Sequence, residues 1–195
     1  MVILMLPIGV LMKEHRVIEK SLNLMTAEKS RIDEGKMDLG VVQALVEFIT
    51  VFADESHHGK EEGMLFPALK GKSRTYEFDE ITTTLMREHA AIRNHLRTIE
   101  NALQWFKEGD KASAETISRE LGEIVALYVK HVAKEDKPFF QVAMTVLSEE
   151  ERDDMLLVMQ EFDLDFTLNH YEKVIDETSS ALIGSEVKLE QLKGR

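Results

Sequence analysis

The sequence of 195 residues contains no cysteine, only three prolines and ten glycines, and a single tryptophan. The absence of thiols excludes disulfides, cysteine nucleophiles, iron–sulfur clusters and zinc sites built on cysteine. The scarcity of proline and glycine, beside plentiful Leu, Glu, Lys, Ala and Met, favours helix over sheet. Any metal ion must therefore be held by imidazole and carboxylate groups, which suit iron, manganese or zinc.

Positive charge is also scarce, because 24 Lys and Arg residues stand against 36 Asp and Glu residues, for a formal net charge of −12. Nucleic-acid binding relies on clustered basic side chains, so we expect no nucleic-acid partner. The mostly apolar run from Met1 to Met12 is too short to span a bilayer and is interrupted by Pro7 and Gly9. It also lacks the basic start and the cleavage pattern of a signal peptide. We therefore expect no membrane partner and a cytoplasmic location.

Apolar residues recur at helical spacing along the chain, and no segment shows the alternation of a strand. We predict a single all-α domain, with the longest loop at residues 71–78. Residues 1–147 would form a helical bundle, and residues 148–195 a C-terminal helix packed on it and a short polar tail from Ser185 to Arg195. The first two predicted helices run from Pro7 to a stop at Gly35 and from an N-cap at Asp38 to Pro67, which should kink or end the second. The others run from Ile81 to Phe106, from Ile117 to Phe139 with a bend at Pro138, and from a capping box at Ser148 to about Ile183.

Part of the sequence repeats at an offset of 74 positions, which indicates an internal duplication. Two duplicated helical hairpins pack most simply as an antiparallel four-helix bundle. That packing would bring four histidines toward one interior site. The matching polar residues are His15 with His89, His57 with His131, Glu61 with Glu135, and Glu62 with Asp136.

Six of these polar residues fall in apolar rows, where a bundle ordinarily places Leu or Ile. A histidine and a glutamate four residues apart lie on one helix face and can reach a common ion. A buried carboxylate without a partner costs several kcal/mol, and neither Lys nor Arg occupies these rows. The candidate metal ligands are His15, His57, Glu61, His89, His131 and Glu135.

Three neighbouring residues are candidates either for additional ligands or for flanking groups that hydrogen-bond the ligands: His58, Glu62 and Asp136. On an α-helix His58 would point about 100° away from His57. We expect His95 and His170 to be peripheral. Tyr128, one turn before His131, would pack in the core or hydrogen-bond a bound ligand.

These motifs resemble the hemerythrin-like HHE cation-binding domains over roughly residues 7–146. The resemblance implies a non-haem centre of two iron ions, bridged by two carboxylates and a solvent-derived oxygen (oxo, hydroxo or water), with an open position for dioxygen or a related ligand. Oxygen-carrying members have a second histidine four residues after the first in the third helix, where this chain has Arg93. His58 is a candidate replacement. Their fourth-helix aspartate would correspond to Asp136, whereas the duplication favours Glu135.

Three functions stay open at this point. The first is a metal-binding protein whose di-iron centre binds or senses dioxygen, nitric oxide or iron. The second is a di-iron enzyme that acts on peroxide or repairs damaged iron centres. The third alternative is a helical interaction domain whose polar core residues pair with one another. The sequence leaves the loaded metal and the oligomeric state open.

Overall fold

The computed structural model describes residues 6–72, 76–163, 170, 171, 173–180 and 182. Within these ranges the regular structure is helical, with no strand, so the all-α prediction is confirmed. Residues 170, 171, 173–180 and 182 are helical as well. The α-helices are α1 (Pro7–Asp33), α2 (Leu39–Phe48), α3 (Phe66–Leu69), α4 (Tyr76–Lys107), α5 (Ser113–Lys134), α6 (Phe140–Val146) and α7 (Glu149–Phe162). Three segments with the wider π-helical turn are η1 (Ile49–His58), η2 (Glu61–Leu65) and η3 (Glu135–Phe139).

Several helix ends agree with the local signals in the sequence. Pro7 occupies the first position of α1, and Gly35 follows its end with a φ of 75° that suits glycine. The Asp38 side chain accepts hydrogen bonds from the backbone N–H groups of Gly40 and Val41, and so caps α2.

Two predicted boundaries differ in the structure. The loop predicted to extend to residue 78 is shorter, because α4 begins at Tyr76. Phe78 is buried and stacks on Phe139, with ring centroids 4.9 Å apart, so the packing draws the preceding turn into the helix. Pro67 does not end its segment at once, because it lies in the first turn of α3, where its missing N–H costs little.

The second and fourth predicted helices each contain π-helical turns. The second runs from α2 through η1 and η2 into α3, and the fourth runs from α5 through η3 into α6. The predicted bend at Pro138 is confirmed, because Lys137 leaves helical geometry with φ −149° and ψ 115°. All three π-helical segments carry candidate site residues, in keeping with the frequent occurrence of such turns at functional sites.

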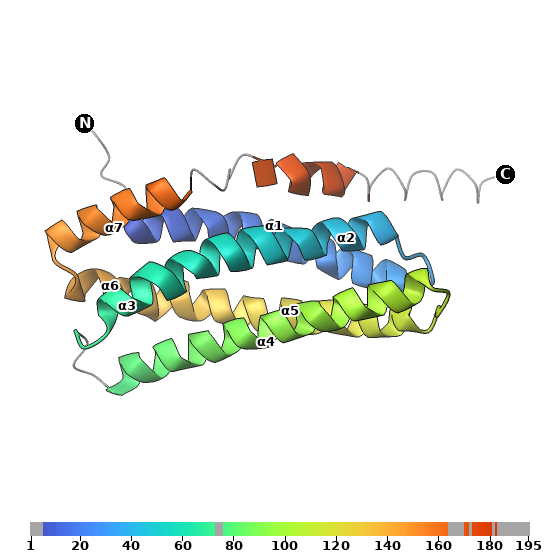
Figure 1. The fold of residues 1–195 in the computed structure, drawn as a ribbon, viewed down its shortest axis with the longest axis horizontal. Helices are drawn as coiled ribbons and strands as arrows, with labels where there is room; N and C mark the ends of the chain where they lie inside the picture. Colours follow the sequence, from blue (N-terminus) through green and yellow to red (C-terminus); the bar gives the residue numbers. More distant parts are fainter. Residues whose placement is uncertain (1–5, 73–75, 164–169, 172, 181, 183–195) are drawn as a thin grey trace.

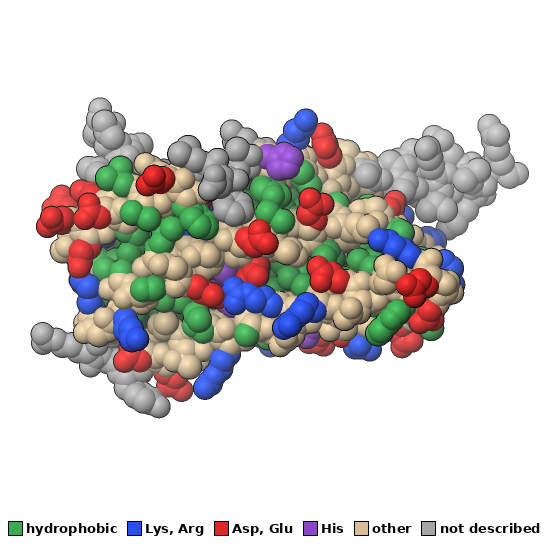
Figure 2. Space-filling view, in the orientation of Figure 1, with side chains coloured by type: hydrophobic (Ala, Val, Ile, Leu, Met, Phe, Trp, Pro, Cys, Tyr) green, Lys and Arg blue, Asp and Glu red, His purple; other side chains and the backbone are tan. Residues whose placement is uncertain are grey.

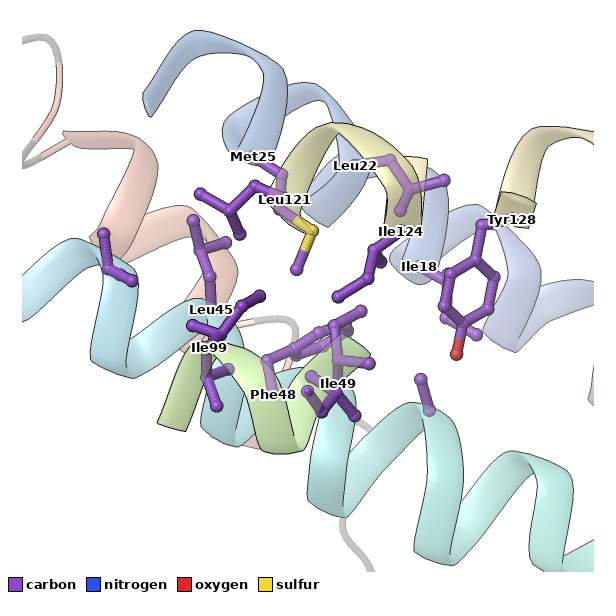
Figure 3. Packing of buried hydrophobic residues seen from close by; sticks show 14 of the residues in the cluster. Ile18, Leu22, Met25, Leu45, Phe48, Ile49, Ile99, Leu121, Ile124 and Tyr128 are labelled. Atoms are coloured by element: carbon purple, nitrogen blue, oxygen red, sulfur yellow. The ribbon is translucent and has the colours of Figure 1, made fainter. Parts of the chain in front are cut away.

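The longest helices lie side by side along the long axis of the molecule (Figure 1), with α5 against both α1 and α4, and α2 against α1. Two apolar clusters fill the interior. The first contains Leu22, Met25, Leu45, Phe48 and Ile99 among others (Figure 3), and the second is built around Phe139 and Phe140.

The candidate histidines lie between these clusters. On α1 the second cluster includes Leu11 and the first begins at Val17, with His15 between them. On α4 the same boundary falls between Leu85 and Ile92. The polar site is thus enclosed by hydrocarbon on both sides. Figure 2 shows a surface of mixed acidic and basic side chains, where histidine appears at only a few points.

Several described residues of the C-terminal part pack on the preceding helices. Ser148 and Glu151 form the predicted capping box of α7, whose Met155 and Met159 are buried in the second cluster. Tyr171 packs against Phe52, with ring centroids 5.3 Å apart. The predicted continuous helix is interrupted, because residue 163 lies in a turn; Ile183 and the tail from Ser185 to Arg195 lie outside the described residues. The division of the chain at residue 147 stays a prediction.

No described helix combines the length and hydropathy required to cross a bilayer.

Candidate metal centre

Seven polar side chains without exposed surface converge between the two apolar clusters. They come from both copies of the repeat and from six helical segments. The π-helical segments η1, η2 and η3 supply four of them, while α1, α4 and α5 supply one each. The seven are His15, His57, His58, Glu61, His89, His131 and Glu135.

The first group of potential ligand atoms belongs to His15, His57, Glu61 and Glu135, and all of them lie within 4.8 Å of one another. The Nε2 atoms of His15 and His57 are 3.0 Å apart. His15 Nε2 lies 3.2 Å from Glu135 Oε2, and His57 Nε2 lies 3.7 Å from Glu61 Oε1. One cation at the centre of this group would reach two imidazoles and two carboxylates.

The second group consists of His58, Glu61, His89 and His131, again with potential ligand atoms within 4.8 Å of one another. The Nε2 atoms of His89 and His131 are 3.2 Å apart. His89 Nε2 lies 3.4 Å from Glu61 Oε2, and His131 Nε2 lies 3.1 Å from Glu135 Oε1. Glu61 and Glu135 therefore direct one oxygen toward each pair of histidines.

These separations suit metal ligands. Two donors each about 2.1 Å from an ion and at right angles are about 3.0 Å apart. The Nε2–Nε2 distances of 3.0 and 3.2 Å are close to that value, as is the 3.1 Å distance from His131 to Glu135. The donor atoms of each group are therefore close enough together to hold a metal ion.

The Nδ1 atom of each of the five buried histidines contacts a carboxylate. An ionised carboxylate can only accept, so each Nδ1 carries the hydrogen and a neutral ring has a bare lone pair on Nε2. All five histidines belong to the two groups described above. For His15, His57, His89 and His131, the contacts with other members of their groups are made by Nε2. The pairs, with their N–O distances, are His15 with Asp136 (2.8 Å), His57 with Glu14 (2.9 Å), His58 with Asp54 (2.9 Å), His89 with Glu62 (2.7 Å) and His131 with Glu88 (3.0 Å).

The carboxylate oxygens of Glu61 and Glu135 are buried and have no partner with hydrogen-bond geometry. Histidine Nε2 atoms lie 3.1–3.7 Å from these oxygens. When the rings are neutral, each Nε2 has a lone pair that faces the lone pairs of a carboxylate oxygen, and such a contact is repulsive. A cation satisfies both sides of such a contact. In metal-free protein, a proton on one ring of each histidine pair can do the same, so either a metal ion or a shared proton satisfies this cluster.

Without a metal ion, the electrostatics favours one proton on each pair of histidines. Burial lowers the pKa of His131, but the Glu135 and Glu88 carboxylates outweigh it and raise that pKa to about 9. For the partner His89, burial prevails and the pKa is lowered. In the other pair, burial and the neighbouring His15 lower the pKa of His57 to about 4. Burial also lowers the pKa of His15, but the Asp136 and Glu135 carboxylates outweigh it and raise that pKa.

The two central carboxyls differ in the same way. Burial and the nearby Glu135 carboxylate raise the pKa of Glu61 well above its ordinary value. Burial would also raise the pKa of Glu135, but His131 and His15 hold it well below its ordinary range. The central groups are therefore strongly coupled and have no external solvent to stabilise their charges.

His58, predicted as either an additional ligand or a flanking group, lies in the second group, although an α-helix would turn it about 100° away from His57. It lies in the last turn of η1, where the π-helical geometry brings both His57 and His58 into the interior. The His58 ring stacks on His89, with ring centroids 3.8 Å apart. The α-helical angle used for the prediction was wrong for this segment.

Arg93 stands where the oxygen-carrying members have a second histidine in the third helix, and here it holds the carboxylate that orients His58. Its guanidinium donates to Asp54 and, over 2.9 Å, to Glu62. Asp54 accepts from His58, so Arg93 fixes the carboxylate that orients His58. On the other side of the ring, the Tyr128 hydroxyl lies 3.4 Å from His58 Nε2.

The remaining predicted site residues surround the two groups. Glu62 and Asp136 hold His89 and His15 by their Nδ1 atoms, which is one of the two roles considered for them. His95 pairs with Glu120 outside the groups, and His170 is exposed.

Three acids that orient histidines were not predicted as site residues: Glu14, Glu88 and Asp54. The repeat offered a signal for two of them, because Glu14 and Glu88 stand 74 positions apart, each immediately before a candidate histidine. Each holds the histidine of the following hairpin helix, His57 or His131. For Asp54 we find no such signal, since the repeat does not mark it.

Fold and site together define an all-helical protein with a buried histidine and carboxylate cluster suited to metal cations. The family model for the hemerythrin HHE cation-binding domain matches residues 6–143, and the chain belongs to this family. Neither a curated protein nor a solved structure matches the chain. Helix α7 and the residues after it lie outside the family match.

Proposed function

We propose that the protein holds a non-haem di-iron centre that binds or senses a small ligand such as dioxygen or nitric oxide. The observation that carries the proposal is the arrangement of Glu61 and Glu135, each with one oxygen toward either pair of histidines. In this proposal the helices form an antiparallel four-helix bundle of the hemerythrin type around the centre. Manganese or zinc would be accepted by the same nitrogen and oxygen donors.

The two proposed ion positions have unequal donor sets. His15 and His57 serve the first, whereas His58, His89 and His131 serve the second, and both share the two carboxylates. A six-coordinate first ion therefore has more positions left for solvent or an external ligand. When bound, the iron pair supplies redox-active ions with open coordination positions. We place the ligand on the side of His15 and His57.

The protein's own side chains hold the donors and exclude water. Phe140 stacks on His15 with centroids 5.7 Å apart, and Phe66 stacks on His89 at 6.0 Å. Such an enclosure favours small neutral ligands, which lose little hydration on entry, over charged ones.

Elemental analysis of protein purified without added metal, together with its absorption spectrum, tests the proposal. About two irons per chain and charge-transfer absorption in the near ultraviolet are expected. His57→Ala should reduce the iron content, whereas His95→Ala serves as the matched control at a histidine outside both groups. Protein that holds neither iron nor manganese would refute the proposal.

A second candidate function is a di-iron enzyme that acts on peroxide or repairs damaged iron centres. It is favoured by a pocket of about 280 Å³ between α1 and α5, which is lined by Tyr128 and Asp136. The Tyr128 phenol is a proton donor next to His58, and Asp136 holds His15. Steady turnover of peroxide that disappears in His57→Ala would favour the enzyme; stoichiometric binding without turnover would favour the binding protein.

A further inference from the structure

We infer that Asp163, at the end of α7, is a positioning residue for the metal centre and acts on His57 through Lys60 and Glu14. The inference rests on the proposed metal centre and assigns a role to a segment outside the family match. Asp163 itself touches none of the seven central side chains in the contacts described above.

A continuous line of hydrogen bonds joins α7 to the centre. Lys60 has no exposed surface, and its Nζ donates to Glu14 Oε1 over 2.6 Å, to Ser56 Oγ over 3.2 Å and to Asp163 Oδ1. The other oxygen of Glu14, Oε2, accepts from His57 Nδ1 over 2.9 Å. The Nε2 atom of the same ring is a member of the first ligand group.

The charges along this line determine how firmly His57 is held. A buried ammonium group requires compensating carboxylates, and here Lys60 has two. Because Asp163 takes part of the interaction with Lys60, Glu14 keeps more of its negative charge for the His57 N–H. A stronger acceptor at Nδ1 fixes the ring and makes Nε2 a better metal ligand.

The duplicated copy provides an internal comparison. There Lys134 pairs with Glu88, and Glu88 accepts from His131 Nδ1, so the same relay recurs. The Lys134 side chain, however, is 32% exposed, whereas that of Lys60 is 0% exposed. Helix α7 contacts α1 and η2, which belong to the first copy. The C-terminal segment therefore distinguishes two otherwise similar halves of the centre.

Close packing supports the contact between α7 and Lys60. A Cβ atom at Gly59 would lie 3.3 Å from Phe162 Cζ, which is tighter than ordinary contact. The Phe162 ring centroid lies 5.8 Å from Lys60 Nζ, within the range of a cation–π interaction. Glycine at position 59 thus lets the end of α7 approach the buried lysine.

The test uses Asp163→Asn in the full-length, iron-loaded protein, challenged with excess EDTA while iron release is followed. Loss of a supporting carboxylate is expected to accelerate release of one of the two irons about 10-fold, the lower end of the usual effect of such partners. Release of the other iron should keep its wild-type rate. Asp153→Asn, the same change at an exposed position of α7, is the matched control.

Two further variants separate positioning from general loosening of α7. In a Glu14→Gln background Asp163→Asn is expected to have no additional effect on iron release, because the line to His57 is already broken. Asp163→Glu, which restores the charge, should restore slow release. In metal-free protein, ¹⁵N NMR should show a change at the His57 Nδ1–H on Asp163→Asn.

Equal acceleration of both irons, or unchanged release of both, would overturn the inference. Wild-type protein without bound metal would overturn the proposed function and this inference with it. Two irons in the wild type with no selective effect in Asp163→Asn would overturn the inference alone.

Discussion

Glu61→Gln is expected to change stability in opposite directions with and without metal. Glu61 gives one oxygen to each ligand group, so the amide should weaken binding of both ions. Without metal, however, the same change removes a buried carboxyl whose pKa is raised by burial and by Glu135. A purely structural residue would not produce this reversal.

The magnitude in the presence of metal follows from binding linkage. At a free metal concentration 100 times the dissociation constant, each ion stabilises the fold by about 2.7 kcal/mol, so two contribute about 5 kcal/mol. For a chain of this size, about 1 kcal/mol shifts the melting temperature by about 2–4 °C. If Glu61→Gln abolishes binding of both ions, it should therefore lower the metal-loaded melting temperature by roughly 10–20 °C, and partial weakening should lower it by less.

In metal-free protein, the effect of Glu61→Gln on stability follows from the raised pKa of the Glu61 carboxyl. Such a group contributes stability below its ordinary pKa of 4.5, and that contribution is lost as the pH rises through the folded-state value. Metal-free Glu61→Gln should thus melt above metal-free wild type at pH 8, and the difference should shrink as the pH approaches 4.5.

Calorimetric melts with metal and with EDTA measure both arms. Glu123→Gln, the same substitution at an exposed position of α5, is the control and should leave both melts unchanged. An equal loss of stability with and without metal in Glu61→Gln would refute the reasoning, because it would assign Glu61 a packing role only.

Three other predictions concern separate parts of the molecule. In metal-free protein the pKa of His131 is raised from 6.5 to about 9, so His131 contributes up to about 3 kcal/mol to the free energy of unfolding at low pH, and this contribution should be lost as the pH rises across that interval. Urea unfolding of wild type and His131→Gln at several pH values measures the loss. Parallel curves of unfolding free energy against pH for the two proteins would contradict it. His58→Ala should weaken the binding of one metal ion about 10-fold or more, as measured in a competition titration. Tyr128→Phe should leave two ions bound, because the Tyr128 hydroxyl contacts His58 Nε2 but Tyr128 belongs to neither ligand group. Glu28→Ala should lower the free energy of unfolding by about 1–3 kcal/mol with or without metal, because the buried Glu28 carboxylate accepts hydrogen bonds from the Asp38 N–H and from Arg31. Chemical denaturation measures this loss, and a loss confined to metal-loaded protein would count against the explanation.

The helices and the central residues were predictable because their signals are local or repeated. Apolar spacing and the cap at Asp38 specify helices without knowledge of the partner. The repeat then predicts equivalent positions for His57 and His131, and the structure places His57 in the first group of potential ligand atoms and His131 in the second.

The rest depended on geometry that single-helix patterns do not contain. The orientation of His58 follows from the π-helical turns of η1, which the apolar spacing does not reveal. The pairing of Arg93 with Asp54 joins residues 39 positions apart on different helices. The link from Asp163 to Lys60 spans 103 positions and depends on where α7 packs, for which the sequence offers no periodic signal.

The π-helical segments have a consequence for how the chain tolerates change. A wider turn accommodates a residue that an α-helical turn would have no place for, so a deletion within η1 could convert it to ordinary α-helix and still leave a foldable chain. Such a shortened chain would rotate His58 out of the interior while the helix kept its apolar face. Length variation at this one segment could therefore change the number of imidazoles around the ions without redesigning the bundle.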